Sequence, residues 1–352
     1  MKWLDDARRQ IGAGFDAVGL GPQEVPYRVV TELPGARLRA YSDRQDKSGP
    51  VLLIVPAPFK RAYIWDLMPD VSVVRRCLGR GLRVYLLDWL IPTENQDGFG
   101  LAEYASRLPR AAIDAIQAET GLFAPILAGH SLGGTFAAIF ASIFPKRVGG
   151  LILLDAPLAF GEDGGPLATA VRMMPHARII RGIVGTPIPG SVINTLSVAA
   201  APDAFQFQRL ADLSASWLDP KALAIHARVE RWTYDEFPMP AQLFEDTLEQ
   251  LYSEDRFRSG TLQVGERQTG LVSLRGPIMA VVNPVGRVVP PRSVLEGLDV
   301  APNLSVNVLE YEIDRGPVLQ HLGPLVAPLA HERLWPKILD WIGQVSGLLR
   351  SD

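Results

Sequence analysis

The fold of this 352-residue chain is decided by residues 129–134, which read GHSLGG. A short apolar run at residues 125–128 precedes this stretch and predicts a buried strand, and residues 135–144 predict a helix. A Gly-x-Ser-x-Gly pattern between a strand and a helix is typical of a strained turn that exposes the serine hydroxyl at the carboxyl end of a sheet. We therefore interpret Ser131 as a candidate nucleophile.

Short apolar runs alternate with helical patterns on both sides of this turn. Buried strands are predicted at residues 51–55, 82–87, 151–154, 277–282 and 304–309, and helices at residues 72–79, 101–119 and 330–349. Strands separated by helices pair in parallel through right-handed crossovers. The sequence therefore predicts an α/β fold with a doubly wound, mostly parallel sheet.

The alternation of strands and helices is interrupted between residues 158 and 270. This segment is predicted to be mostly helical, and it is rich in proline, glycine and aromatic residues. We expect it to be an insertion into one sheet domain, which is formed by residues 1–157 and 271–352. Residues 1–25 are expected to form a helical N-terminal extension of that domain.

The composition excludes several classes of protein. The chain has 35 Lys and Arg against 38 Asp and Glu, and this balance argues against a dedicated nucleic-acid binder. One cysteine excludes a disulfide framework and a multi-cysteine metal site, and we expect no metal and no cofactor. An acidic N-terminus and interrupted apolar stretches predict neither a signal peptide nor a transmembrane helix, which favours a cytoplasmic protein. The oligomeric state stays open, a homodimer included.

A serine nucleophile requires a base, and the chain has five histidines. His321 follows the last predicted strand, where sheets of this type carry the base, and we expect it to take this role. His130 is expected to pack beside the turn, and His331 to be solvated in the closing helix. His176 and His226 belong to the predicted insertion.

The oxyanion of an acyl-transfer reaction requires two N–H donors. The N–H of Leu132 lies at the start of the helix that follows the turn, where negative charge is stabilised. The second donor is expected in the loop after the strand at residues 51–55. Pro58 has no N–H, so Phe59 is preferred there and Ala57 is the alternative.

The acid that would orient the base is harder to find, because residues 283–291 contain neither Asp nor Glu. Asp155 ends an apolar strand downstream of Ser131, and there it could orient His321 and stabilise the imidazolium. Asp299 and Asp314 are weaker alternatives, and a Ser–His dyad without an acid stays open.

Several segments together resemble one known family. They are residues 51–56, 61–67, 72–75, 84–89, 251–252, 260–262, 288–291 (VVPP), 321–323 (HLG) and 334–338 (LWPKI). With these segments the chain resembles the catalytic subunits of polyhydroxyalkanoate synthases, a family within the α/β-hydrolases. The resemblance implies an α/β-hydrolase fold, a base at His321, and a lid formed by the insertion at residues 158–270.

The chain departs from this family at two catalytic positions. The synthases carry a cysteine where this chain has Ser131, and an aspartate where it has Gly286. The one cysteine, Cys77, falls in a predicted helix away from the turn. Haloalkane dehalogenases of the same fold place their acid at the end of the strand that carries Asp155 here, so this residue is the expected replacement.

A serine nucleophile is the usual choice for ester hydrolysis, with water as the acceptor. The sequence therefore predicts a serine carboxylester hydrolase for a small-molecule or oligomeric ester of acyl or hydroxyalkanoate type. A synthase-like acyltransferase with a thioester donor is the first alternative. A non-catalytic scaffold that binds a polymer or a partner protein is the second.

Overall fold

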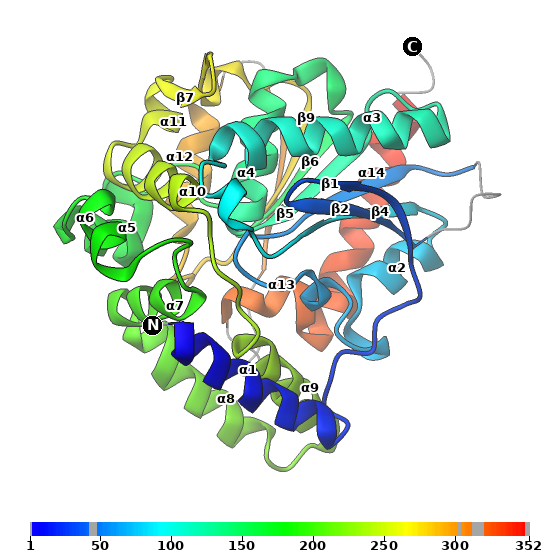
Figure 1. Cartoon of the computed structure of the whole chain (residues 1–352). Helices are drawn as coiled ribbons and strands as arrows, with labels where there is room; N and C mark the ends of the chain where they lie inside the picture. The colour runs from blue at the N-terminus through cyan, green and yellow to red at the C-terminus, as the bar shows by residue number, and fades with distance from the viewer. Residues whose placement is uncertain (1, 42–47, 302–303, 312–319, 349–352) are drawn as a thin grey trace.

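An eight-stranded, mostly parallel sheet forms the centre of the molecule (Figure 1). The computed structural model describes residues 2–41, 48–301, 304–311 and 320–348. The strand order is β1-β2-β4-β3-β5-β6-β9-β10. Strand β2 runs antiparallel to its neighbours β1 and β4, and the other neighbouring strands pair in parallel. The strands are β1 (Arg28–Leu33), β2 (Ala36–Ala40), β3 (Val51–Val55), β4 (Arg83–Trp89), β5 (Ile126–His130), β6 (Gly150–Leu154), β9 (Pro277–Val282) and β10 (Ser305–Glu310). The predicted doubly wound sheet is confirmed.

The central strands are apolar throughout because both faces of the sheet are covered. In β3 all five residues are buried. Leu52 and Ile54 belong to one hydrophobic cluster, whereas Val51, Leu53 and Val55 belong to the cluster on the opposite face. Successive side chains of a strand point to opposite faces, so a continuous apolar run is required where helices cover both.

Helices cover both faces of the sheet in the order that the sequence predicts. The cluster that contains Val51 includes residues of α3 (Leu108–Thr120) and α4 (Leu132–Ile143). The cluster that contains Leu52 includes residues of α2 (Val73–Gly79) and α14 (Trp335–Leu348). The other helices and short helical turns outside the insertion are η1 (Ala62–Trp65), η2 (Pro69–Val71), η3 (Glu94–Gln96), η4 (Glu103–Arg107), η5 (Pro145–Arg147), η9 (Leu271–Ser273), α12 (Pro291–Asp299), η10 (Gln320–Leu322), α13 (Gly323–Val326) and η11 (Ala330–Leu334).

Helical insertions between β6 and β9 interrupt this arrangement. They are η6 (Glu162–Gly164), α5 (Gly165–Met173), α6 (Ala177–Val184), α7 (Gly190–Ala200), η7 (Asp203–Phe207), α8 (Gln208–Ser216), α9 (Pro220–Thr233), α10 (Ala241–Asp246), η8 (Thr247–Ser253) and α11 (Arg256–Ser259). A small hairpin, β7 (Leu262–Val264) with β8 (Arg267–Thr269), was not predicted, because strands of three residues are too short to show an alternating pattern. No helix in the described parts of the chain has the length and apolarity needed to span a bilayer.

The N-terminal helix α1 (Lys2–Ala17) lies beside the insertion. It packs along α9 and contacts α7 (Figure 1). A helix is thus present at Lys2–Ala17, and its contacts reach the inserted helices. The boundaries of the core (1–157 and 271–352) and of the lid (158–270) stay a proposal.

Candidate active site

Ser131 occupies a strained turn between β5 and α4. Its backbone angles, φ 54° and ψ −135°, lie outside the regions that residues with a side chain ordinarily adopt. Its N–H donates to the Leu154 carbonyl of β6 at 3.0 Å, and its own carbonyl accepts from the N–H of Gly134 at 2.9 Å. The neighbouring strand and the first turn of α4 therefore hold the nucleophile candidate in this conformation.

The glycines around Ser131 are required because the backbone passes too close for a side chain. A Cβ atom on Gly129 would lie 2.4 Å from the Gly134 nitrogen, and one on Gly133 would lie 2.3 Å from the Val55 carbonyl oxygen. A Cβ atom on Gly134 would lie 2.4 Å from the Ala156 side chain. The turn at GHSLGG thus packs against the end of β3 and the residues after β6 so closely that only glycine fits at these positions.

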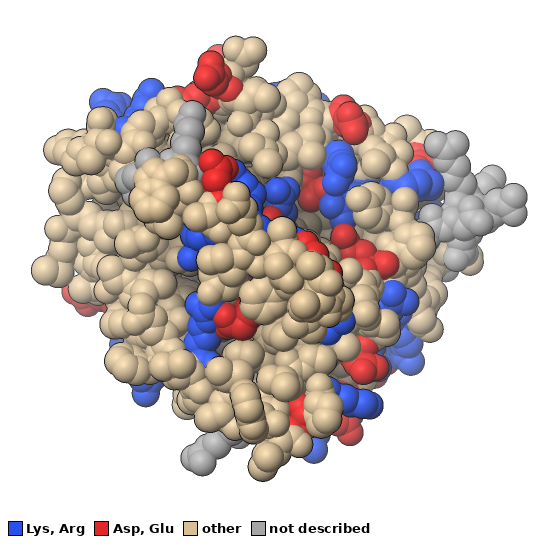
Figure 2. Space-filling view, turned by 60° about the horizontal axis from the view of Figure 1, so that its bottom comes forward, with Lys and Arg blue, Asp and Glu red and all other residues tan. Residues whose placement is uncertain are grey.

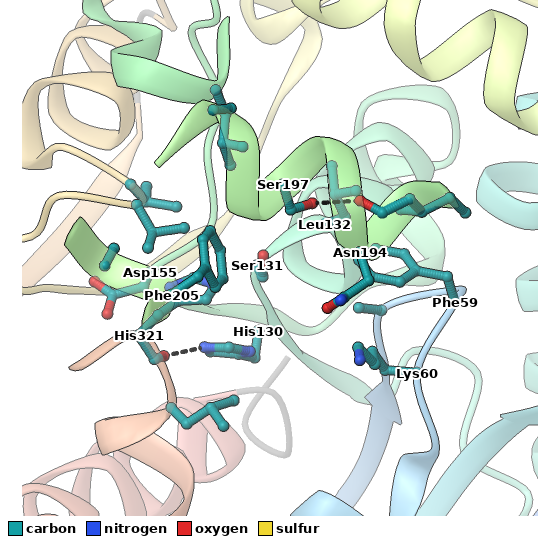
Figure 3. A pocket seen from close by; sticks show the side chains of 18 of the residues that line it. Phe59, Lys60, His130, Ser131, Leu132, Asp155, Asn194, Ser197, Phe205 and His321 are labelled. Atoms are coloured by element: carbon teal, nitrogen blue, oxygen red, sulfur yellow. Dashed lines mark hydrogen bonds between the residues drawn. The ribbon is translucent and has the colours of Figure 1, made fainter. Parts of the chain in front are cut away.

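A cavity of about 210 Å³ opens at Ser131. Its floor comes from the carboxyl ends of the sheet strands, and inserted helices contribute the opposite wall (Figure 3). The predicted site residues all line it: Phe59, Ser131, Leu132, Asp155 and His321. Most of the wall from the insertion is apolar, with Val171, Met174, Ile193, Phe205, Phe244 and Leu248. The cavity therefore offers an apolar surface beside a small group of polar side chains.

Two backbone N–H groups are available beside Ser131. Leu132 is the first residue of α4, so its N–H points out of the helix N-terminus. Phe59 lies in the loop after β3 and also borders the cavity. No described residue accepts a hydrogen bond from either N–H group. Both donors are therefore free to bind an oxyanion, and Ala57 borders the same cavity as the alternative to Phe59.

His321 lies in η10 and packs directly against His130 at the end of β5. The two ring centroids are 4.4 Å apart, and the His130 Nε2 atom is 2.6 Å from the His321 carbonyl oxygen (Figure 3). Burial, with a smaller contribution from His130, lowers the pKa of His321 well below its ordinary value. His321 is therefore neutral at pH 7, as a general base must be. Within the described ranges no hydrogen bond joins Ser131 to His321.

Asp155 follows β6 and is only 2% exposed. Its φ of 42° is positive, and its Oδ1 atom accepts the Asn283 N–H at 3.0 Å. Burial raises the pKa of the Asp155 carboxyl to about 7, although the Asn283 N–H favours the ionised form. Figure 3 shows Asp155 and His321 on the same side of Ser131. Among the described residues no hydrogen bond links Asp155 to His321.

Three other positions were considered for the acid, and none of them brings a carboxylate to the cavity in the described parts of the chain. Gly286 borders the cavity, but a Cβ atom there would lie 2.6 Å from the Val289 carbonyl oxygen. The loop is therefore closed to a side chain at Gly286. Asp299 is exposed at the end of α12 and does not line the cavity, and Asp314 lies outside the described residues.

The expectation for His331 is wrong. Its side chain is 1% exposed, and its Nε2 atom lies 2.7 Å from the Leu325 carbonyl oxygen. The helical pattern of residues 330–349 did not reveal this, because the contact is made to the preceding helix α13, whose position depends on tertiary packing. His331 is a structural residue away from the cavity.

Several polar residues of the cavity wall escaped the sequence analysis, among them Lys60, Asn194 and Thr247. Lys60 follows Phe59, and its ammonium group lies 3.3 Å from Glu236 Oε1. Asn194 enters from α7 (Figure 3). Thr247 of η8 also lines the cavity, and its buried hydroxyl has no hydrogen-bond partner in the described structure. Two of the three belong to the insertion, which carries no recognisable motif, so no sequence signal marks them. The described residues contain no group of His, Cys, Asp or Glu arranged to hold a metal ion.

The sheet topology and the strained serine turn together are those of the α/β-hydrolase fold. Residues 50–173 match the family model described as the alpha/beta hydrolase fold. The crystal structure of Bacillus megaterium epoxide hydrolase in complex with an inhibitor shares this fold, with a TM-score of 0.53 and 15% identity, over 90% of this chain and 100% of that one. The chain therefore has the α/β-hydrolase fold.

By sequence the chain is similar to poly(3-hydroxyalkanoate) polymerase subunits PhaC. It is 26% identical to the Haloferax mediterranei subunit over 332 residues, which are 94% of this chain and 65% of that protein. It is 27% identical to the Synechocystis sp. subunit over 304 residues, which are 83% of this chain and 77% of that protein. The chain therefore spans just under two thirds of the Haloferax relative, and the predicted resemblance to the synthase family is confirmed.

Proposed function

We propose that this chain is a serine carboxylester hydrolase for esters of acyl or hydroxyalkanoate type. The observation that supports this most directly is the strained turn of Ser131 in an apolar cavity that His321, Asp155 and two free N–H groups also border. The apolar wall from the insertion suits an acyl chain, since burial of each CH₂ group contributes about 0.8 kcal/mol.

In this reaction the Ser131 Oγ atom attacks the ester carbonyl carbon while His321 takes the hydroxyl proton. The carbonyl oxygen becomes an oxyanion, which the N–H groups of Leu132 and Phe59 bind. The alcohol then leaves with the proton from His321, and an acyl group stays on Ser131. Water attacks this acyl group by the same sequence of steps, releasing the acid and restoring the serine. Asp155 would offset the charge of the imidazolium in both halves.

The proposal is tested by labelling with a fluorophosphonate probe and by hydrolysis of p-nitrophenyl esters. Ser131→Ala should abolish labelling and lower kcat by roughly 10⁴- to 10⁶-fold, as loss of a triad serine does. Ser197→Ala is the matched control, because Ser197 also lines the cavity but its hydroxyl bonds the Ile193 carbonyl within α7. Full activity in Ser131→Ala would exclude the mechanism.

A thioester-dependent acyltransferase is the second candidate, and the similarity to polymerase subunits favours it. The same acyl-Ser131 species would then pass its acyl group to an alcohol in place of water. Measurement of thioester consumption with and without an alcohol acceptor separates the two candidates. Consumption that depends on the alcohol, with little free acid formed, would favour transfer over hydrolysis.

A non-catalytic scaffold is the third candidate. It is favoured by the closed backbone at Gly286 and by the separate hydrogen-bonding of Asp155 in the described structure. Stoichiometric labelling of Ser131 by the probe would exclude it, because an inert scaffold has no activated serine.

A further inference from the structure

We propose that His130 is a positioning residue that holds the base His321 where it can take the proton of the Ser131 hydroxyl. This inference rests on the proposed function, in which His321 is the base. It is carried by the 2.6 Å contact between the His130 Nε2 atom and the backbone carbonyl oxygen of His321 (Figure 3). His130 is also the residue directly before Ser131.

The contact fixes the proton arrangement of His130. A carbonyl oxygen can only accept, so the His130 Nε2 atom must carry the hydrogen. The side chain is 6% exposed, and burial lowers the pKa of His130 to about 4, so the ring is neutral at pH 7. The pair is therefore a neutral N–H donor on a buried side chain and a backbone carbonyl acceptor.

The two partners of this bond differ in rigidity. His130 ends β5, which pairs with β6 on one side and β3 on the other. His321 lies in the short 3₁₀ turn η10, which is only three residues long. The bond therefore ties a short turn to a strand that is paired on both sides. The ring of His321 also packs against the ring of His130 at an interplanar angle of 40°, with centroids 4.4 Å apart, which limits where the base can point.

A displaced base is costly because proton transfer requires near-ideal geometry, and a 1 Å displacement can lower a rate by about 10²-fold. In His130→Leu we expect Ser131 to react with the fluorophosphonate about 10²-fold more slowly. We expect kcat for p-nitrophenyl esters to fall in parallel, with KM nearly unchanged. In His130→Gln the amide nitrogen reaches the position of Nε2, so most of the rate should return.

His331 provides a matched control elsewhere in the chain. Its Nε2 atom also contacts a backbone carbonyl oxygen, that of Leu325, at 2.7 Å, and it does not line the cavity. His331→Leu should lower the melting temperature but leave the labelling rate of Ser131 unchanged. In a His321→Ala background His130→Leu should have no further effect, because there is no base left to position.

The outcomes separate this inference from the proposed function. If wild-type Ser131 does not react with the probe, the hydrolase proposal fails and the role of His130 falls with it. If wild type reacts and His130→Leu reacts equally fast, only the role of His130 is overturned. An equal loss in His130→Leu and His130→Gln, with matching losses of thermal stability, would show that His130 only supports the fold.

Discussion

Asp155 is the residue whose surroundings bear most on the proposed mechanism. Its carboxyl is almost fully buried, it accepts one N–H from Asn283, and burial raises its pKa to about 7. A carboxyl in this state is partly protonated near neutral pH. It can stabilise the imidazolium of His321 only after it has lost its proton, so its ionisation should limit the reaction on the acidic side.

Asp155→Asn should lower kcat by about 10⁴-fold, as loss of the triad acid does. In wild type, kcat/KM should rise as the pH increases through about 7, since the carboxylate form is the active one. His321 should not produce this limb, because its pKa lies well below 6.5. Asp299→Asn, at an exposed acid outside the cavity, is the control and should behave as wild type. Near-native turnover in Asp155→Asn would remove the residue from the mechanism.

The same carboxyl should affect stability with a definite sign. The folded pKa of about 7 lies above the ordinary value of 3.8, so the folded state binds the proton more tightly than the unfolded state. Relative to Asp155→Asn, wild type should therefore lose stability as the pH rises from about 4 to about 7. The loss should be on the order of 4 kcal/mol at 1.4 kcal/mol per pKa unit. Urea unfolding of both proteins across this pH range measures it, and parallel curves would contradict the burial of an ionisable carboxyl.

At the scale of elements, the inserted helices supply most of the apolar wall of the cavity. The turn η7 presents Phe205 to the cavity, whereas Phe207 of the same turn is 64% exposed. Helices α5 and α7 add further apolar side chains to the wall. Under the proposed function, the insertion would therefore set the length of acyl chain that the cavity accepts, while the ends of the sheet strands would supply the reacting groups.

Phe205→Ala should widen the cavity and shift the preference toward longer acyl chains. We expect the ratio of kcat/KM for p-nitrophenyl decanoate to that for p-nitrophenyl butyrate to rise about tenfold or more, since each methylene accommodated is worth about 1 to 3 kcal/mol. Phe207→Ala is the matched control and should leave the ratio unchanged. Equal ratios in all three proteins would show that η7 does not shape the acyl site.

At the scale of the whole molecule, the N-terminal helix ties the insertion to the sheet domain. The Asp5 carboxylate of α1 is 6% exposed and accepts the N–H groups of Gly190 and Ser191 at 3.2 and 2.9 Å. These N–H groups begin α7, whose later residues line the cavity. Arg8 bonds Glu236, which also pairs with Lys60 in the loop after β3. The helix thus connects the cavity wall at α7 with the loop that carries Phe59, the proposed oxyanion donor.

Asp5→Asn should weaken this connection, because an amide oxygen cannot replace both carboxylate oxygens and carries no charge for the helix N-terminus. We expect a loss of about 1 to 2 kcal/mol and a melting temperature lower by a few degrees. Hydrogen exchange at the first amides of α7 should become faster. Asp6→Asn is the control, since its side chain is 63% exposed and pairs only with Arg9 within α1 among the described contacts. Identical exchange in the two variants would contradict the capping role.

The local sequence determined the catalytic turn and the sheet, because both depend on short-range patterns. Continuous apolar runs mark strands covered on both faces, and glycines mark the close contacts around Ser131. Tertiary structure alone decided which distant groups meet there. The contact of His130 with His321 spans 191 positions, and the bond between Asp155 and Asn283 spans 128. The burial of His331, the closed loop at Gly286 and the cavity wall from α7 and η7 also depend on chain segments packing together. Such contacts depend on how separate elements pack together, and no local pattern in the sequence predicts them.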